Sequence, residues 1–242
     1  MDEKELLKER FRTAVSSAAK VISGKFDLNI KFGNNLNKQK DSINLPDIIN
    51  LKNLQDFTNL RAFADSEALK IKYTNKKIYI ENEPKGVMAK SLYAIAEKIR
   101  YEKIGCNQLK GVKNNIVQCY ENKFKDKKIE EIKTEADVPI TEAFELYLRN
   151  HFFKIKQTDS TKKILSYWKN LFDKNLKTRL GELTSCINDQ FKFNHIAAEL
   201  INNLDFEDSD DNEKKKEEES AENNSFSENN DEKNNKTEEE KK

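Results

Sequence analysis

The residues best suited to chemistry in this sequence lie within one predicted helix, at IAEKIRYEKIG over positions 95–105. With about 100° between successive residues, Glu102 falls inside the apolar stripe of that helix, whereas Glu97 and Arg100 fall on a second, mixed face. A carboxylate at an apolar position destabilises a fold unless it is paired or hydrogen-bonded. Local ion pairs of Glu97 with Arg100 and of Glu102 with Lys98 are the favoured interpretation. A buried polar cluster that holds a neighbouring loop or a partner subunit comes second, and a catalytic carboxylate third.

Other motifs with known chemistry are absent from the sequence. It contains no G-x-x-x-x-G-K-[ST] phosphate loop, no D-x-S-x-S cation site, no H-E-x-x-H and no C-x-x-C. Nothing in the sequence places His151 or His195 beside a nucleophile, so both are predicted to be structural. Cys106, Cys119 and Cys186 are odd in number and far apart, which indicates reduced thiols. We therefore expect no catalytic residue, no metal site and no cofactor.

The composition divides the chain into two regions. From position 205 onward the only hydrophobic residues are two phenylalanines and one alanine, too few to offset the entropy of ordering the backbone. This segment carries 16 acidic residues and 7 lysines, a net charge of −9, so the total of +1 leaves about +10 on the rest of the chain. We expect a folded domain over residues 1–204 and a disordered acidic tail over residues 205–242.

Charge and hydropathy also bear on partners and location. A basic domain is compatible with a nucleic-acid partner, but its lysines are scattered and form no arginine-rich stripe, which disfavours nucleic acid. The sequence has no run of 18 apolar residues and no signal peptide, so we expect no membrane partner and a cytoplasmic location. The oligomeric state stays open, a homo-oligomer included.

Low glycine and proline counts, 6 and 3, favour long helices over a turn-rich β fold. Apolar residues at three- and four-residue spacing predict helices, the third broken near Gly105 and Gly111 and the last near Gly181. The predicted helices cover residues 1–23, 54–64, 85–124, 141–153, 160–175 and 176–204.

Alternation of apolar and polar residues indicates the β structure. It predicts a strand over residues 26–32 that ends in a turn at 33–35, followed by a polar loop over 34–56. A small hairpin is predicted over residues 69–84 around Thr74-Asn75, although its first half also fits a helix. The expected fold class is mainly α, an α+β multi-helix domain with a small β-strand or hairpin element.

Several short sequence pieces follow one another in an order that points to a known family. They are Ala64-Asp65-Ser66 with Ala68-Leu69, then Glu97, Arg100, Glu102 and Gly105, then Gly111-Val112 with Asn115, and last the segment from Ala136 to Arg149. Their order and spacing resemble the amino-terminal region of the T subunit of aerobic, ATP-dependent cobaltochelatase, from the first helix to about Leu204. One departure is Thr74-Asn75, which stands where the family pattern has a histidine-aspartate pair.

The resemblance implies a function and partners. Fuller members of the family join a helical amino-terminal region to an acidic linker and a von Willebrand A-like domain. They work with a ring-forming AAA+ ATPase subunit and a large corrinoid-binding subunit, which insert cobalt during cobalamin synthesis. By resemblance, this chain is a non-catalytic subunit of such a complex that docks onto the ATPase. The binding or assembly candidates that follow are Asp65, Glu97, Arg100, Glu102, Gly105, Gly111 and Asn115.

The end of the sequence leaves an alternative open. The segment from position 205 looks like the family's acidic linker, so the chain would stop where the last domain begins. On that view it is a fragment, a truncated product or half of a split gene. The alternative function is a stand-alone protein-interaction module without chelatase activity.

Overall fold

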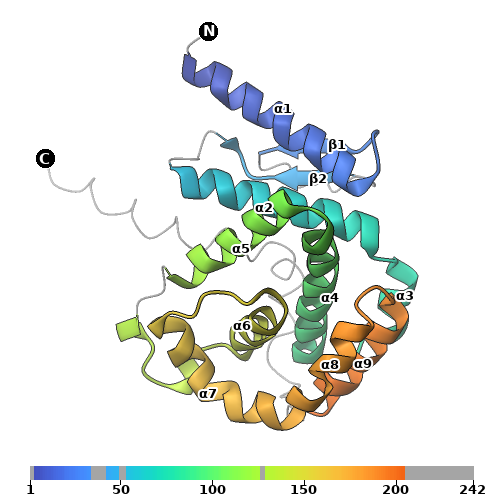
Figure 1. The fold of residues 1–242 in the computed structure, drawn as a ribbon, viewed down its shortest axis with the longest axis vertical. Helices are drawn as coiled ribbons and strands as arrows, with labels where there is room; N and C mark the ends of the chain where they lie inside the picture. Colours follow the sequence, from blue (N-terminus) through green and yellow to red (C-terminus); the bar gives the residue numbers. More distant parts are fainter. Residues whose placement is uncertain (1–2, 34–41, 49–52, 126–128, 205–242) are drawn as a thin grey trace, which may run out of the picture. The chain divides into compact units, whose positions relative to one another are not determined.

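The first helix of the chain forms as its sequence predicts. The computed structural model describes residues 3–33, 42–48, 53–125 and 129–204 (Figure 1). Helix α1 (Glu3–Ser23) has acidic residues in its first turn and a lysine in its last, both favourable for the helix dipole. Gly24 follows with a φ of +72°, a backbone conformation that suits glycine and ends the helix.

The strand that follows α1 pairs with a second strand that the sequence reasoning missed. Strand β1 (Asn29–Phe32) runs parallel to β2 (Ser42–Leu45), with Asn29 opposite Ser42 and Phe32 opposite Leu45. The prediction of a polar loop over 34–56 is therefore wrong for residues 42–45, where Ile43 and Leu45 are buried. In a run of only four residues, the alternation of apolar and polar side chains does not distinguish a strand from a loop. Pairing with a neighbouring strand decides the structure. The rest of the predicted turn, at positions 34 and 35, lies outside the described residues.

The predicted hairpin over residues 69–84 is wrong, and its helical alternative is correct. Helix α2 (Leu54–Tyr73) runs well past the predicted end at residue 64, and the next segment forms α3 (Lys76–Asn82). Thr74 closes α2 with a backbone hydrogen bond to Lys70, while the Asn75 side chain accepts from the first N–H groups of α3. Thr74 and Asn75 thus cap two successive helices. Polar residues of this kind are common both at helix caps and in hairpin turns, so the dipeptide fits either structure.

The predicted helical segment over residues 85–124 is confirmed as two helices. Leu109 alone separates helix α4 (Val87–Gln108) from helix α5 (Lys110–Lys125). The break thus falls between the two glycines that the sequence marked.

The helices that complete the chain also agree with their predicted positions, apart from the last break. The helix predicted over 176–204 changes from a 3-10 turn to an α-helix at 179–180, next to the predicted break at Gly181, and has a second break at 186–189 that the sequence did not indicate. The described elements after α5 are η2 (Ile129–Glu131), η3 (Glu135–Asp137), α6 (Ile140–Phe153), α7 (Asp159–Asn175), η4 (Lys177–Arg179), α8 (Leu180–Ser185) and α9 (Gln190–Asn202).

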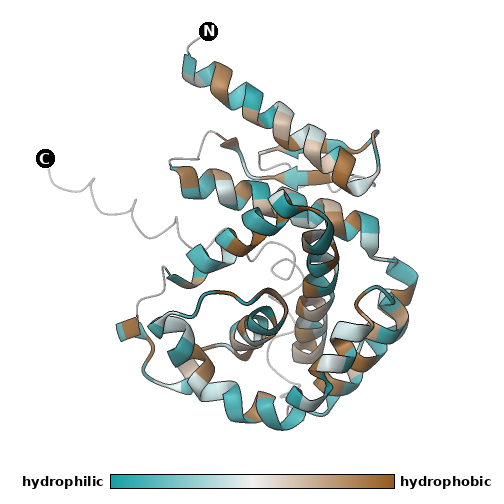
Figure 2. Ribbon diagram, in the orientation of Figure 1, coloured by the Kyte–Doolittle hydropathy of each residue, from teal (hydrophilic) through white to brown (hydrophobic). Residues whose placement is uncertain are grey.

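Helix α4 lies at the centre of the helical packing. It packs against α2, α5, α6 and α9, while α1 and strand β2 pack on α2. Most helices in Figure 2 carry both hydrophilic (teal) and hydrophobic (brown) residues, as expected for amphipathic helices around a core. A mainly α fold with a small β element is therefore confirmed. Across the described helices, none is long and apolar enough to cross a membrane. The predicted tail at 205–242 lies outside the described residues.

Candidate functional site

Helix α4 is buried on both of the faces that its sequence distinguishes. Leu92 and Ile99 of the apolar stripe are fully buried, and so are Glu97, Arg100 and Glu102, each no more than 3% exposed. Neighbouring helices therefore pack on both of these faces. Charged side chains at such depth require partners, and they find them in two separate groups.

The first group, here called the Glu97 group, consists of Thr74, Glu97, Arg100 and Gln190. Arg100 Nε and Nη2 donate to the two carboxylate oxygens of Glu97 at 2.7 and 2.9 Å, a bidentate pair within one helix turn. The Thr74 hydroxyl and the Gln190 amide also donate to Glu97 Oε1, at 2.7 and 3.2 Å. The predicted local pair of Glu97 with Arg100 is thus present, but it is buried and recruits residues from two other segments.

The Glu97 group also ties down backbone from outside α4. Arg100 donates to the carbonyl of Tyr73 at 2.5 Å and to that of Ile187 at 3.4 Å. Gln190 accepts from the Asn75 N–H at 2.7 Å and donates to the Asn75 carbonyl at 3.2 Å. The group therefore joins the end of α2, the start of α3 and the start of α9 to the middle of α4.

The second group, here called the Glu102 group, consists of Ser66, Glu102, Glu145 and Arg149. Glu102 forms an ion pair with Arg149 at 2.8 Å, and Ser66 donates to its other carboxylate oxygen at 2.6 Å. Arg149 also pairs with Glu145 at 3.0 Å. The predicted local pair of Glu102 with Lys98 is wrong, because α6 delivers an arginine to the same place from far along the chain.

Charge and an aromatic ring stabilise the Glu102 group further. The Arg149 guanidinium carbon lies 3.2 Å from the ring centroid of Tyr120, a cation–π contact between α6 and α5. Burial alone would raise the pKa of Glu145, but the charges of Lys123 and Arg149 outweigh it and hold that pKa well below its usual value. Glu145 and Arg149 therefore stay ionised.

Asp65 lies beside these groups on α2 and has its own partners. Arg61 Nε donates to one carboxylate oxygen at 2.8 Å, and the Asn115 amide donates to the other at 2.9 Å. Burial raises the pKa of Asp65, while Arg61 and Asn115 act in the opposite direction. This contact joins the first and third of the motif pieces, on α2 and α5.

The two glycines of the motif pieces differ in their surroundings. A Cβ atom at Gly105 would lie 2.5 Å from Leu69 Cδ1, so glycine permits the close contact of α4 with α2. A Cβ atom at Gly111 would meet nothing within 4 Å, and the residue is exposed. Gly111 is the one candidate that the structure leaves apart from the others.

Sequence reasoning missed several residues of the site. Arg149 and Glu145 are spaced four apart on α6, in an apolar context that could have marked them as a buried pair. Thr74 stood out only as a departure from the family pattern, and Gln190 carried no signal, since it is an ordinary polar residue near a helix end. Their role depends on which segments the fold brings to α4.

The arrangement suits cohesion between helices better than acid–base chemistry. Each carboxylate of the two groups is held by an arginine, and the groups are buried, so a substrate has no access to a free acid or base. In the part of the chain that the structure describes, no three histidine, cysteine or acidic side chains are placed to hold a metal ion. The histidines lie elsewhere, with His151 on Thr184 and His195 beside Glu199.

Comparison with known proteins identifies the family. No solved structure matches the chain. The family model described as cobalamin biosynthesis protein CobT matches residues 6–242, a span that includes both buried groups, the Asp65 contacts and the acidic segment. Family membership implies a cobaltochelatase-related role in cobalamin biosynthesis. The chain therefore belongs to the CobT family of cobalamin biosynthesis proteins.

Proposed function

We propose that this protein is a non-catalytic subunit of an ATP-dependent cobaltochelatase complex, which docks onto an AAA+ ATPase subunit and serves the large corrinoid-binding subunit. The proposal is carried by the partners of the motif residues. Glu97, Arg100 and Glu102 all form their ion pairs with residues of the same chain. Residues used in this way build a rigid body that transmits force or position, while the chemistry of metal insertion belongs to another subunit.

The Glu97 group also points to a docking surface. It fixes the start of α3 and of α9, and these two helices pack against each other and expose apolar side chains. Ile80 on α3 is 59% exposed and Phe191 on α9 is 48% exposed. Large apolar side chains on a rigid, exposed surface are typical of protein–protein contacts. We assign the ATPase contact to this surface of α3 and α9.

Co-purification with the cognate ATPase tests the proposal. The tagged ATPase is mixed with the chain in ATP, in a non-hydrolysable analogue and without nucleotide, and the complex is measured by gel filtration. We expect a stoichiometric complex that Ile80→Ser and Phe191→Ser each weaken about tenfold, the loss of one interface anchor. Leu54→Ser is the matched control. Leu54 is 83% exposed, but it begins α2, whose other end adjoins α3 about 30 Å further along the helix.

The outcomes separate the two candidate functions. Failure of the native chain to bind the ATPase in every nucleotide condition contradicts docking and favours a stand-alone interaction module. If Leu54→Ser weakens binding as much as Ile80→Ser does, docking onto the ATPase stands, but the α3–α9 surface is not the contact.

A further inference from the structure

Positive charges from three helices gather at one place on the surface. Lys103 of α4 is half-buried, whereas Lys113 of α5 and Lys154, directly after α6, are exposed. The Lys103 ammonium nitrogen lies 5.7 Å from the centroid of the Phe153 ring, which brings it to the end of α6. Burial lowers the pKa of Lys103, and the charges of Lys113 and Lys154 lower it further. The three lysines, here called the Lys103 cluster, therefore lie close enough for their charges to repel one another.

No acid among the described residues neutralises the Lys103 cluster. None of its three lysines forms an ion pair with another described residue, whereas Lys123 on α5 pairs with Glu145. Among the groups that act on the pKa of Lys103, only the Cys106 thiol raises it, and no carboxylate is among them. Like charges without a counter-charge repel one another, so the cluster itself does not stabilise the fold.

Two of the lysines occupy positions where another residue would suit the fold better. Lys113 lies in the first turn of α5, where a positive charge opposes the helix dipole. Lys154 has a φ of +55° and a ψ of +46°, and among the described residues a positive φ is otherwise confined to glycines. The dipole of α6 favours a lysine after its last turn, but this backbone conformation suits glycine or asparagine. Unpaired charges at such positions point to a ligand outside the chain.

His151 of α6 lies beside the cluster and is a natural reporter of what binds there. Burial lowers the pKa of His151, and the charges of Lys154 and Lys103 lower it further. Its Nε2 lies 2.9 Å from the Thr184 hydroxyl oxygen, and that hydroxyl donates its own proton to the Leu180 carbonyl. Thr184 therefore accepts from the His151 Nε2–H, a bond that both the neutral and the charged ring can make. An anion at the cluster would offset the lysine charges and so raise the pKa of His151.

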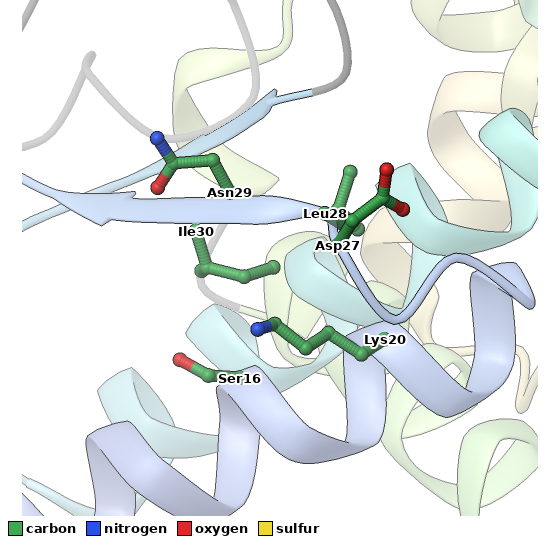
Figure 3. Close-up of a pocket in the computed structure, with 6 residues that line it drawn as sticks. All are labelled: Ser16, Lys20, Asp27, Leu28, Asn29 and Ile30. Carbon is green, nitrogen blue, oxygen red and sulfur yellow. The ribbon is translucent and has the colours of Figure 1, made fainter.

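The groove between α1 and β1 offers a comparison, because it contains an isolated lysine. The groove is lined by Ser16, Lys20 and residues 27–30 (Figure 3). Lys20 is half-buried, as Lys103 is, but the same lining contains the acid Asp27. One lysine together with one acid gives the groove no net charge with which to hold an anion. Lys20 is therefore a matched control for Lys103.

We propose that the Lys103 cluster binds a compact anion with at least two negative charges, of the kind that a diphosphate group carries. A single carboxylate brings one charge to three ammonium groups, whereas a diphosphate brings several charges and enough oxygens to accept from all three. Lysine binds phosphate as a point charge, so the three side chains need no fixed planar geometry. The cluster contains neither Ile80 nor Phe191, so this proposal and the α3–α9 docking surface stand or fall separately.

Calorimetric titration of the full chain with inorganic pyrophosphate, at low ionic strength and in a phosphate-free buffer, tests the site. We expect one pyrophosphate to bind per chain. Lys103→Gln and Lys113→Gln should each weaken binding about tenfold, the loss of one charged contact. Lys20→Gln removes the same charge elsewhere and should leave the affinity unchanged. Lys154→Gly should weaken binding and yet raise the Tm, because glycine suits the left-handed backbone, a combination that a purely structural lysine would not give.

Proton NMR of the two histidines provides a second measurement. Pyrophosphate should raise the pKa of His151, while the ring signals of His195, beside Glu199 on α9, should not respond. Absence of pyrophosphate binding at low ionic strength overturns the proposal, as does an equal loss of affinity in Lys20→Gln and Lys103→Gln. A glutamate-rich peptide that binds more tightly than pyrophosphate also overturns it and makes the cluster a contact for an acidic protein.

ADP as a second probe distinguishes the sources of the diphosphate. Tighter binding of ADP than of pyrophosphate supports the site and assigns it to a nucleotide. An affinity for ADP no greater than that for pyrophosphate supports the site and assigns it to the free anion.

Discussion

Arg149 on α6 and Glu102 on α4 form an ion pair of 2.8 Å although their side chains are only 0% and 1% exposed. The two residues lie 47 positions apart in the sequence, on different helices. It also places Arg149 against the ring of Tyr120 on α5. Three helices therefore depend on one charged contact in the core, and loss of either partner leaves an unmatched charge there.

Replacement of Glu102 by glutamine should destabilise the protein strongly. Glu102→Gln keeps the size of the side chain but removes the charge that faces Arg149. We expect the free energy of unfolding to fall by about 3 kcal/mol, at the lower end for a broken buried pair because Glu145 still faces Arg149. Urea denaturation followed by circular dichroism measures the loss.

Two further variants separate this effect from a general loss of charge. Arg179→Ala breaks two ion pairs on the surface, with Glu182 and with Glu199, and should change the unfolding free energy by no more than about 1 kcal/mol. The double variant E102Q/R149M should be less destabilised than the sum of its single variants, because each single variant already loses the Glu102–Arg149 pair, while Glu145 keeps its ion pair with Lys123. Additive losses would contradict a direct coupling between the two side chains.

Much of the helical fold could be predicted because its signals are local. Apolar spacing indicated α1, α4, α6 and α7. The hairpin error has the same origin, since Leu69 and Tyr73 alternate with polar residues and are also four apart. Both periods fit so short a run, and packing against neighbouring helices decides between them.

The partners of the buried charges could not be predicted, because they depend on contacts distant in sequence. Lys98 stands four residues before Glu102 and was the natural partner on one helix. A lysine there can reach water, however, whereas Arg149 comes from α6 into the core and forms the ion pair. The choice follows from how α4 and α6 pack, and no single-helix pattern contains that information.

Alanine at Gly105 should destabilise the contact between α4 and α2. The added Cβ would lie 2.5 Å from Leu69 Cδ1, well inside van der Waals contact, so either the buried Leu69 side chain or the two helices must shift. We expect Gly105→Ala to lower the unfolding free energy by about 1–3 kcal/mol, typical of overpacking, in the same urea denaturation.

Gly111 offers a matched control for the glycine substitution. It lies in α5 with open space around it, so Gly111→Ala should stabilise the protein by about 0.5 kcal/mol through helix propensity and a less flexible unfolded chain. Equal losses at both positions would show that the contact with Leu69 does not explain the effect at Gly105.

Glu145 should contribute to stability at neutral pH and lose that contribution in acid. Lys123 and Arg149 hold its pKa below the usual 4.5, so the unfolded chain takes up the proton first as the pH falls. Its contribution is fully present above pH 4.5 and disappears as the pH falls through the folded pKa. The difference in unfolding free energy between the native chain and Glu145→Gln should therefore shrink below pH 4.5. Parallel curves for the two proteins would contradict this linkage.

The contribution of Asp65 to stability should change with pH in the opposite direction. Burial raises its pKa above the usual 3.8, while Arg61 and the Asn115 amide counteract the rise. Asn115→Ala removes a hydrogen bond to the ionised form, so the pKa should rise further, and Arg61→Ala should raise it more because its charge acts more strongly. Carbon-13 NMR titration of the carboxyl group measures each value.

Asn122→Ala provides the control for the Asp65 titration, because Asn122 lies on the same helix as Asn115 but bonds to Gln118 instead. Its substitution should leave the pKa of Asp65 where it is. The sign also fixes the effect on stability. With the folded pKa raised, the contribution of Asp65 is present below pH 3.8 and is lost as the pH rises through the folded value. Asp65→Asn should therefore gain stability relative to the native chain as the pH rises, and a fall over that interval would mean that Arg61 outweighs burial.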